Sequence, residues 1–483
     1  MIKQKKIEKI LLIAPPAYSS KTISRKLRDI NPLPPMGLGY IASVAESLGI
    51  GVNIFDCLIR GWDIEEDVDH NLVRIGLTDK DIEKKLHDYQ PDLVGINCQF
   101  SRQYKMYHEL FAIIKKYNPD CITVAGGAHV TVCPGEVLND KNCDFVVTGE
   151  GEETFRDLLI SLNDGGNVKE LDGFGWKDGD KTIINPKTKW IANLDSIRFP
   201  AYHLMDINQY FGLAKSHGER HKKRFSPITT SRGCPAKCVF CSANKVWGKK
   251  YRIRSVENVI AEMRILKDQY GIEELMFEDD NVTANAKRAK ELFTRMIDEK
   301  FDFVWDTPNG VGAWSLDNEL IDIMKQSGCV QLNFPVESGS QKVLTEIINK
   351  PLNLEKVKSL IAHCKRIGLS YGMFLVMGLP GETKKDIWKS IQFAEECGCY
   401  NPHISVATPY PGTKLFEICK SENYFAREFS LDDLFIKSFM LCTDQWTEDD
   451  LKKIQFKAKL YLRFKMLLND PKTFFSKVIK RLT

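Results

Sequence analysis

Short apolar runs alternate with amphipathic segments over residues 8–162 of the chain. The apolar runs have the length of buried strands and occupy residues 10–13, 52–55, 93–96, 122–124 and 145–147. Apolar side chains recur at helical spacing over residues 37–48, 79–89, 109–116 and 152–162. This alternation predicts an α/β fold with a doubly wound, Rossmann-like parallel sheet, whose ligands lie beyond the carboxyl ends of the strands.

A second region of the same kind spans residues 225–425. Its strand-like runs occupy residues 225–230, 275–277, 303–305, 331–334, 373–376 and 404–407. Helical patterns such as those at 255–270 and 285–300 separate the runs. We expect six strands of βα type, with functional residues at their C-terminal ends.

The remaining segments are a connector and a tail. Residues 166–224 contain a predicted hairpin that turns at Asp178-Gly179, and end in a basic run at 221–224 that we expect to be solvated. The tail after residue 425 is helical, basic and aromatic. The sequence favours its docking on the protein itself, with contact to a membrane surface or to a partner as the alternatives. The predicted domains are 1–165, 166–224, 225–425 and 426–483.

Composition narrows the class of protein. A length of 483 residues favours more than one domain. The 68 basic and 64 acidic residues give a net charge of +4, which is too balanced to indicate a nucleic-acid partner. No uninterrupted apolar stretch approaches the roughly 18 residues that span a bilayer. The 14 cysteines have no paired spacing, which indicates a reducing, cytoplasmic location rather than a disulfide framework.

Three cysteines stand close together directly after the run at 225–230. Cys234, Cys238 and Cys241 have the spacing C-x₃-C-x₂-C in a loop shaped by Gly233 and Pro235. Thiolates are the preferred ligands of zinc and of iron–sulfur clusters, but a structural zinc ion needs four closed ligands and the next cysteine is Cys329. Three ligands to a four-iron cluster would leave one iron open to a small molecule. The alternative is three buried structural cysteines.

This loop, with Phe240 before its last cysteine, resembles the cluster loop of the radical S-adenosylmethionine (SAM) superfamily. The resemblance implies a [4Fe-4S] cluster whose open iron binds the amino and carboxylate groups of SAM. One electron from an external donor of the flavodoxin or ferredoxin type then splits SAM to a deoxyadenosyl radical. It also implies that the six strands form a partial (β/α)₆ barrel.

The ends of later strands carry further motifs of this superfamily. Glu278-Asp279-Asp280 is acidic, Glu337-Ser338-Gly339-Ser340 resembles an E-S-G-S element, and Gly378 to Thr383 resembles a G-x-P-G-E-T turn. Carboxylates suit the cationic amine and ribose hydroxyls of SAM, although a lone acid at a strand end is more often a helix cap. The resemblance implies SAM contacts from Phe240, Asp279, Asp280, Glu337, Ser338, Met377 and Gly378.

Glycines follow the strands of the N-terminal third in an order that resembles the cobalamin domain of one radical SAM subfamily. The matching segments are 34–40, 92–96, 126–129 and 148–152. The resemblance implies cobalamin contacts from Pro35, Leu38, Asn97, Ser101, Gly126, Gly127, Ala128, His129, Thr148, Gly149 and Glu150. Residues 56–61 depart from the D-x-H-x-x-G loop of many cobalamin proteins because they contain no histidine. We therefore expect base-off binding, and a lining or turn role for His129 rather than cobalt ligation.

Together these resemblances imply a cobalamin-dependent radical SAM methyltransferase. Methylcobalamin would carry a methyl group from one SAM, and the deoxyadenosyl radical from a second SAM would activate an unactivated carbon of the substrate. The alternatives are a cobalamin-dependent radical SAM cyclase or rearrangement enzyme without methyl transfer, and a non-catalytic cobalamin or redox sensor. The substrate is left open among small molecules, lipids, porphyrins and peptides.

Overall fold

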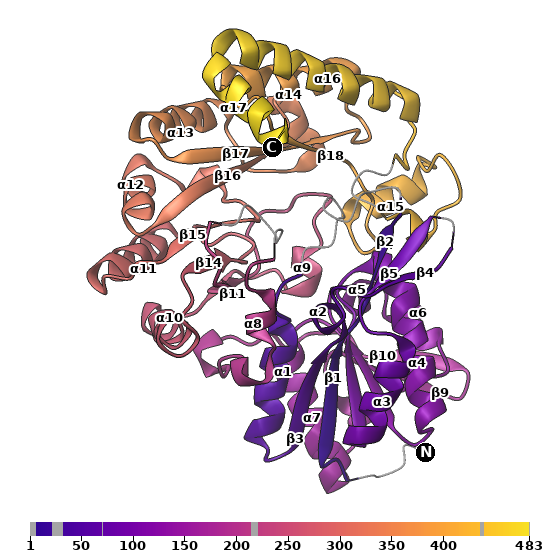
Figure 1. Ribbon diagram of the computed structural model, residues 1–483. Helices are drawn as coiled ribbons and strands as arrows, with labels where there is room; N and C mark the ends of the chain where they lie inside the picture. The colour runs from indigo at the N-terminus through magenta and orange to yellow at the C-terminus, as the bar shows by residue number, and fades with distance from the viewer. Residues whose placement is uncertain (1–5, 22–31, 70, 214–220, 435–438, 483) are drawn as a thin grey trace. The chain divides into compact units, whose positions relative to one another are not determined.

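The computed structural model describes residues 6–21, 32–69, 71–213, 221–434 and 439–482, with side chains through residue 476 (Figure 1). The chain forms two compact units. The first comprises residues 1–227 and 245–274, and the second comprises 228–244 and 275–483. The four-part domain division expected from the sequence stays a proposal.

The first unit is built on a seven-stranded sheet of order β10-β9-β8-β7-β6-β1-β3. Its parallel strands are β1 (Lys9–Ala14), β3 (Gly51–Asp56), β6 (Leu93–Asn97), β7 (Ile122–Gly126) and β8 (Phe145–Val147). The predicted hairpin, β9 (Phe174–Asp178) and β10 (Lys181–Ile184), extends the sheet antiparallel. All five predicted parallel strands and the hairpin are confirmed.

The strands of this sheet are apolar because helices cover both of its faces. Five of the six β1 residues are buried, as expected for a parallel strand covered on both faces. The main helices are α1 (Met36–Ser47), α3 (Asp79–Tyr89), α4 (Tyr104–Tyr117) and α7 (Gly151–Asp164). Ile82 and Leu86 of α3 share one core with Leu11 and Ile13 of β1. The bounds of α3 agree with the prediction because Thr78 and Asp81 form a capping box at its start.

Several short elements of the first unit have no clear periodicity in the sequence. A separate antiparallel sheet joins β2 (Ala17–Ser20), β5 (Leu72–Ile75) and β4 (Glu65–Asp67). The three residues of β4 are exposed and acidic, so no alternation marks them as a strand. Further short elements are α2 (Cys57–Arg60), α5 (Ala128–Val132), α6 (Pro134–Asn139), α8 (Ile207–Tyr210) and β13 (Arg252–Ile253). The longer helix α10 (Val256–Tyr270) matches the helical pattern expected at 255–270.

The second sheet has six strands in chain order, β11-β14-β15-β16-β17-β18. They are β11 (Phe225–Ile228), β14 (Glu274–Phe277), β15 (Val304–Asp306), β16 (Cys329–Glu337), β17 (Ser370–Met377) and β18 (His403–Val406). The pairs from β15 to β18 are parallel. The intervening elements are β12 (Ser231–Arg232), α9 (Ala243–Val246), α11 (Ala286–Asp298), α12 (Asn318–Gln326), a π-helix (Val343–Ile348), α13 (Leu354–Ile367) and α14 (Lys384–Glu396). The predicted partial (β/α)₆ barrel is confirmed.

The C-terminal region is helical, with α15 (Lys414–Ser421), α16 (Glu448–Asn469) and α17 (Pro471–Leu482). One face of α16, including Leu451, Ala458 and Leu462, is buried, and α16 packs on α14. Figure 1 shows α16 and α17 in yellow beside α14. Docking of the tail on its own protein is therefore confirmed for α16. No helix in the described residues is long and apolar enough to cross a membrane.

Candidate cofactor sites

The first candidate site is the carboxyl edge of the parallel strands in the first unit. Their order, β3-β1-β6-β7-β8, places the topological switch point between β1 and β6, because the chain crosses over β1 after β3. Ligands of doubly wound sheets bind beside such a point. The loops after β6, β7 and β8 contain most of the residues predicted to contact cobalamin.

The two glycines at the end of β7, Gly126 in its last position and Gly127 directly after it, differ in what surrounds them. Gly127 has φ 116°, and a Cβ atom there would lie 2.7 Å from the carbonyl oxygen of Cys98, so a side chain is excluded. A Cβ atom on Gly126 would meet only the carbonyl oxygen of Val147, at 3.9 Å. The backbone of Gly126 therefore borders open space, where a large ligand can approach closely.

Other predicted cobalamin residues divide into half-buried and buried groups. Asn97, Gly126, Gly127, Ala128 and Gly149 are half-buried, whereas Pro35, Leu38, Ser101, His129, Thr148 and Glu150 are buried. Phe100, which sequence reasoning did not select, is 66% exposed in the loop after β6. An exposed aromatic ring beside a glycine-lined edge suits a planar cofactor.

His129 is occupied by protein groups. Its Nδ1 lies 3.0 Å from the hydroxyl of Ser101, and its Nε2 lies 3.1 Å from Oε2 of Glu136. Glu136 also contacts His108, whose pKa is raised to about 9 by hydrogen bonds to Asp140 and Glu136. Both ring nitrogens of His129 thus contact protein groups, and its role toward cobalamin stays a prediction.

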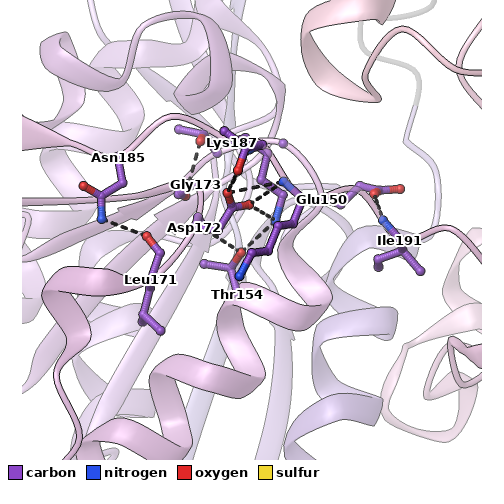
Figure 2. A network of polar contacts seen from close by, with 12 residues as sticks. Glu150, Thr154, Leu171, Asp172, Gly173, Asn185, Lys187 and Ile191 are labelled. Atoms are coloured by element: carbon purple, nitrogen blue, oxygen red, sulfur yellow. Dashed lines mark hydrogen bonds and ion pairs between the residues drawn. The ribbon is translucent and has the colours of Figure 1, made fainter.

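The side chain of Glu150 likewise has hydrogen-bond partners within the first unit. Both of its carboxylate oxygens accept from Arg252, at 2.8 and 2.7 Å, and Oε2 also accepts from the backbone N–H of Ile191. Figure 2 shows the bond to Ile191 and, nearby, Lys187 donating to Thr154. Any contact between Glu150 and a cofactor must therefore use its backbone.

Asp56 starts the segment that lacks the histidine of other cobalamin proteins. Its Oδ1 accepts from the backbone N–H groups of Leu58 and Ile59 and caps α2, and its Oδ2 accepts from the Tyr210 hydroxyl. This segment thus ends in a capped helical turn without a nitrogen ligand. Base-off binding stays a prediction, and the glycine edge fits a cofactor held by shape and backbone.

The second candidate site begins with the cysteine loop after β11. Cys234 and Cys238 are half-buried and Cys241 is exposed. The loop is held by backbone bonds from Val239 to Ile348 of the π-helix, at 3.0 Å, and from Leu415 to Val239, at 2.8 Å. The loop starts at Gly233, whose φ of 83° favours glycine.

The three thiols are of the type that binds iron–sulfur clusters. No group of three His, Cys, Asp or Glu side chains within the described ranges is placed to hold one metal ion. Burial raises the pKa of Cys238 to about 11, so cluster binding must release thiol protons. The donor set fits a [4Fe-4S] cluster.

Asp279 and Asp280 follow β14 and have different roles. Asp279 is 2% exposed and accepts from the backbone N–H and hydroxyl of Thr230 and from the hydroxyl of Ser231. It therefore fixes the entry to the cysteine loop. Asp280 is half-buried, and its buried Oδ2 atom has no hydrogen-bond partner among the described residues. Burial, and then the charge of Asp279, raise the pKa of Asp280 to about 6.

Glu337 and Ser338 form a strained turn after β16. Glu337 has φ 66°, which is unfavourable for a residue with a side chain, and its Oε1 lies 2.9 Å from Nζ of the buried Lys350. The hydroxyl of Ser338 lies 3.2 Å from that of Ser390 in α14. Strain of this kind clusters at ligand sites, but both predicted side chains already have protein partners. Lys350 carried no signal in the sequence.

The turn after β17 depends on Glu382, the glutamate of the G-x-P-G-E-T segment. Met377 is buried, and Gly378 has φ 80° and donates its N–H to Oε2 of Glu382 at 2.8 Å. Leu379 donates to the same oxygen. Burial raises the pKa of Glu382 to about 8. Glu382 therefore shapes the backbone that is expected to lie along adenine.

Unpaired buried polar atoms occur at the strand ends of this sheet, and also in the first unit, as at Asn53 Oδ1 and Trp176 Nε1. In the part of the chain that the structure describes, Asp280 Oδ2, Asn281 Nδ2 and Thr307 Oγ1 lack hydrogen-bond partners. Buried polar groups are normally paired, so such atoms indicate an absent ligand. A carboxylate, an amide and a hydroxyl match the amine and ribose of SAM, and Phe240 is half-buried in the adjoining loop.

Comparison with known proteins agrees with both sites. Residues 228–394 match the Radical SAM superfamily, and residues 31–159 match the B12 binding domain. The chain is 36% identical over 428 residues to the cytidylyl-2-hydroxyethylphosphonate methyltransferase of Streptomyces wedmorensis, covering 82% of this chain and 80% of the relative. It is 34% identical over 484 residues to an uncharacterised methyltransferase of Pyrococcus horikoshii, covering 99% and 97%.

A solved structure shows the same fold. The radical SAM methyltransferase TsrM from Kitasatospora setae, with cobalamin and a [4Fe-4S] cluster bound, matches with a TM-score of 0.67 at 16% identity. The match covers 88% of this chain and 76% of TsrM. The paired domains and the identity to a relative over most of both lengths show that this chain belongs to the cobalamin-binding radical SAM methyltransferase family.

Proposed function

We propose that this enzyme transfers a methyl group from SAM to an unactivated carbon of a small-molecule substrate. When bound, cobalamin supplies the methyl carrier, and the cluster supplies one-electron cleavage of SAM. The observation that carries the proposal is the three-thiol loop beside Asp280, whose buried Oδ2 has no partner in the described residues. The thiols provide ligands for iron, and the Asp280 carboxylate provides a hydrogen-bond acceptor for the cationic SAM.

The chain's own groups have distinct tasks in this reaction. Cys234, Cys238 and Cys241 hold three irons, and Asp280 accepts a hydrogen bond from SAM. The backbone at Gly378 lines adenine, supported by Glu382. We assign Asp279 to holding the cysteine loop rather than SAM, because its oxygens accept from Thr230 and Ser231. Positioning rather than proton transfer is the protein's main contribution.

In the first unit, backbone dominates the proposed cobalamin contacts. Gly126 offers its backbone to the cofactor, and Gly127 allows β7 to turn directly into α5. The loop from Asn97 to Ser101 adds Phe100, and Thr148 and Gly149 complete the edge. His129 and Glu150 hold these loops in place through their internal partners.

The proposed partners follow from the chemistry. Reductive cleavage of SAM needs an external one-electron donor, for which we propose a flavodoxin or ferredoxin. All 14 cysteines are free thiols, which supports a reducing, cytoplasmic location. The cytidylylated hydroxyethylphosphonate named for the Streptomyces relative is the first substrate to test, because that relative is 36% identical.

Oxygen-free incubation with methyl-labelled SAM, cobalamin, a reductant and the candidate substrate tests the proposal. We expect labelled product together with S-adenosylhomocysteine and 5′-deoxyadenosine. A cyclase or rearrangement enzyme would give deoxyadenosine without S-adenosylhomocysteine. Tight cofactor binding without deoxyadenosine would instead indicate a sensor. Either of these results would contradict methyl transfer.

A further inference from the structure

The outward face of α16 carries a stripe of exposed apolar side chains. Phe456, Leu460, Phe464 and Leu468 are 64%, 50%, 59% and 60% exposed. Their spacing of four residues keeps them on one side of the helix. The other large apolar side chains exposed in the described residues are Val68, Phe100, Ile160, Ile184 and, on α17, Phe475. Those outside α16 and α17 lie on separate elements, so this stripe is the main apolar patch.

The fold does not need this stripe, because the opposite face of α16 holds the helix in place. Leu451, Ala458 and Leu462 are buried there. At one end of α14 Lys384 pairs with Asp450 at 2.9 Å, and at the other Glu395 pairs with Lys465 at 2.8 Å. Helix α16 is thus anchored along its length, which leaves the stripe available for something outside the chain.

Basic side chains alternate with the stripe. From Lys452 to Ser476 the sequence contains seven lysines and arginines and a single acid, Asp470. Lys453, Lys457 and Arg463 are exposed and have no ion pair within the described ranges. The acids of α16 are confined to its first turn. Helix α16 therefore has a basic and apolar surface, although the net charge of the whole chain is near zero. We call this the α16 surface and define it as Lys453, Phe456, Lys457, Leu460, Arg463, Phe464 and Leu468.

We propose that this α16 surface docks in plane on an anionic lipid membrane. Phenylalanine and leucine interleaved with lysine and arginine are typical of helices that lie in the lipid headgroup region. There the apolar rings enter the acyl boundary, while long basic side chains extend to phosphates. The proposal concerns a surface remote from the cofactor motifs in sequence and does not depend on the proposed reaction.

The composition of the surface disfavours other occupants. Lysine is depleted at the centres of protein–protein interfaces, yet here lysines stand between the apolar side chains. A second copy of this chain would bring two basic stripes together, and like charges oppose that contact. Anionic lipid satisfies both the apolar and the basic groups.

Sedimentation of the full-length protein with vesicles tests this inference. One set contains phosphatidylcholine alone, and the other contains phosphatidylcholine with phosphatidylglycerol. We expect binding only to the anionic vesicles, weakened by high salt. A Phe456→Ser/Phe464→Ser variant and a Lys453→Glu/Lys457→Glu variant should each bind roughly tenfold more weakly. Ile160→Ser, which removes an exposed apolar side chain from α7, should bind like the parent.

Circular dichroism establishes that the variants retain their helices, and the charge variant tests the surface without changing any apolar group. Absence of parent binding to anionic vesicles would overturn the proposal, as would equal binding by the folded variants. Light scattering distinguishes self-association. A parent dimer that dissociates on Phe456→Ser/Phe464→Ser, without lipid, would assign the surface to a second copy and overturn the membrane assignment.

Discussion

The two cofactor regions are built in different ways. At the edge of the first sheet, the polar side chains of His129 and Glu150 are satisfied by protein partners, and backbone at Gly126 borders open space. At the strand ends of the second sheet, Asp280, Asn281 and Thr307 present polar atoms without partners among the described residues. The first region therefore suits recognition by shape and backbone, and the second suits recognition by side chains.

This difference sets how each region should respond to mutation. A backbone site is disturbed by adding atoms, whereas a side-chain site is disturbed by removing a charge or a ligand. Substitutions of these two kinds can separate loss of cobalamin from loss of SAM chemistry.

The largest effect is expected from Cys238→Ser. Removing one of three thiolates should abolish both the cluster and every product of SAM cleavage. Cobalamin binding should persist, because the cysteine lies outside the first unit. Iron content, visible absorbance and 5′-deoxyadenosine provide the measurements. Cys442→Ser is the matched control, since Cys442 is also a half-buried free thiol. Normal cluster content in Cys238→Ser would contradict the assignment.

Asp280→Asn should lower SAM cleavage by about 10- to 100-fold with the cluster intact. The estimate corresponds to losing one hydrogen bond to a charged group. The comparison is Asp279→Asn, which should disturb Thr230 and Ser231 and therefore reduce cluster content as well. Iron content and deoxyadenosine are measured for both variants. Equal iron content in Asp280→Asn and Asp279→Asn would contradict the assignment of Asp280 to SAM and of Asp279 to the cysteine loop.

Substitutions at Gly126 and Gly127, at the end of β7, should have smaller effects, each on a different property. Gly126→Leu should reduce cobalamin retention by about tenfold with little change in thermal stability, because its side chain enters open space. Gly127→Ala should cost about 1–3 kcal/mol of folding stability, since its φ of 116° is strained for alanine. Cobalamin content and thermal melting, measured on both variants, distinguish the loss of cofactor from the loss of stability. Full cobalamin retention in Gly126→Leu would place the cofactor elsewhere.

The smallest effect on turnover is expected from Glu382→Gln, which should change the pH dependence of stability. The folded state holds a proton on Glu382 up to its pKa of about 8, whereas the unfolded state loses it near the ordinary value of 4.5. Stability should therefore fall as pH rises between these values, by at most about 1.4 kcal/mol per pH unit.

Glutamine stays neutral and can still accept from Gly378 and Leu379, so the variant should lose this slope. Denaturant unfolding at several pH values measures it. An unchanged slope in Glu382→Gln would show that another group titrates.

Much of the fold follows from local signals. The strands of both sheets are marked by apolar runs, and α3 is delimited by the Thr78 and Asp81 capping box. The exposed acids of β4 gave no such signal, because its pairing with β5 is set by tertiary structure. Cys234, Cys238 and Cys241 were identifiable because their spacing alone carries the chemistry.

The remaining site features depend on distant partners. The sequence did not separate Asp279 from Asp280, because the distinction arises from Thr230 and Ser231 around Asp279. It also did not show that Arg252 would occupy the Glu150 carboxylate. These pairings bring together residues far apart in the chain, and no local periodicity encodes them.

Metal and cofactor analysis of oxygen-free protein tests the central claim most directly. The account predicts about four irons with matching sulfide per chain, together with one cobalamin. Added SAM should perturb the spectrum of the reduced cluster, because one iron has no protein ligand. Zinc in place of iron, or a cluster whose spectrum does not respond to SAM, would contradict it.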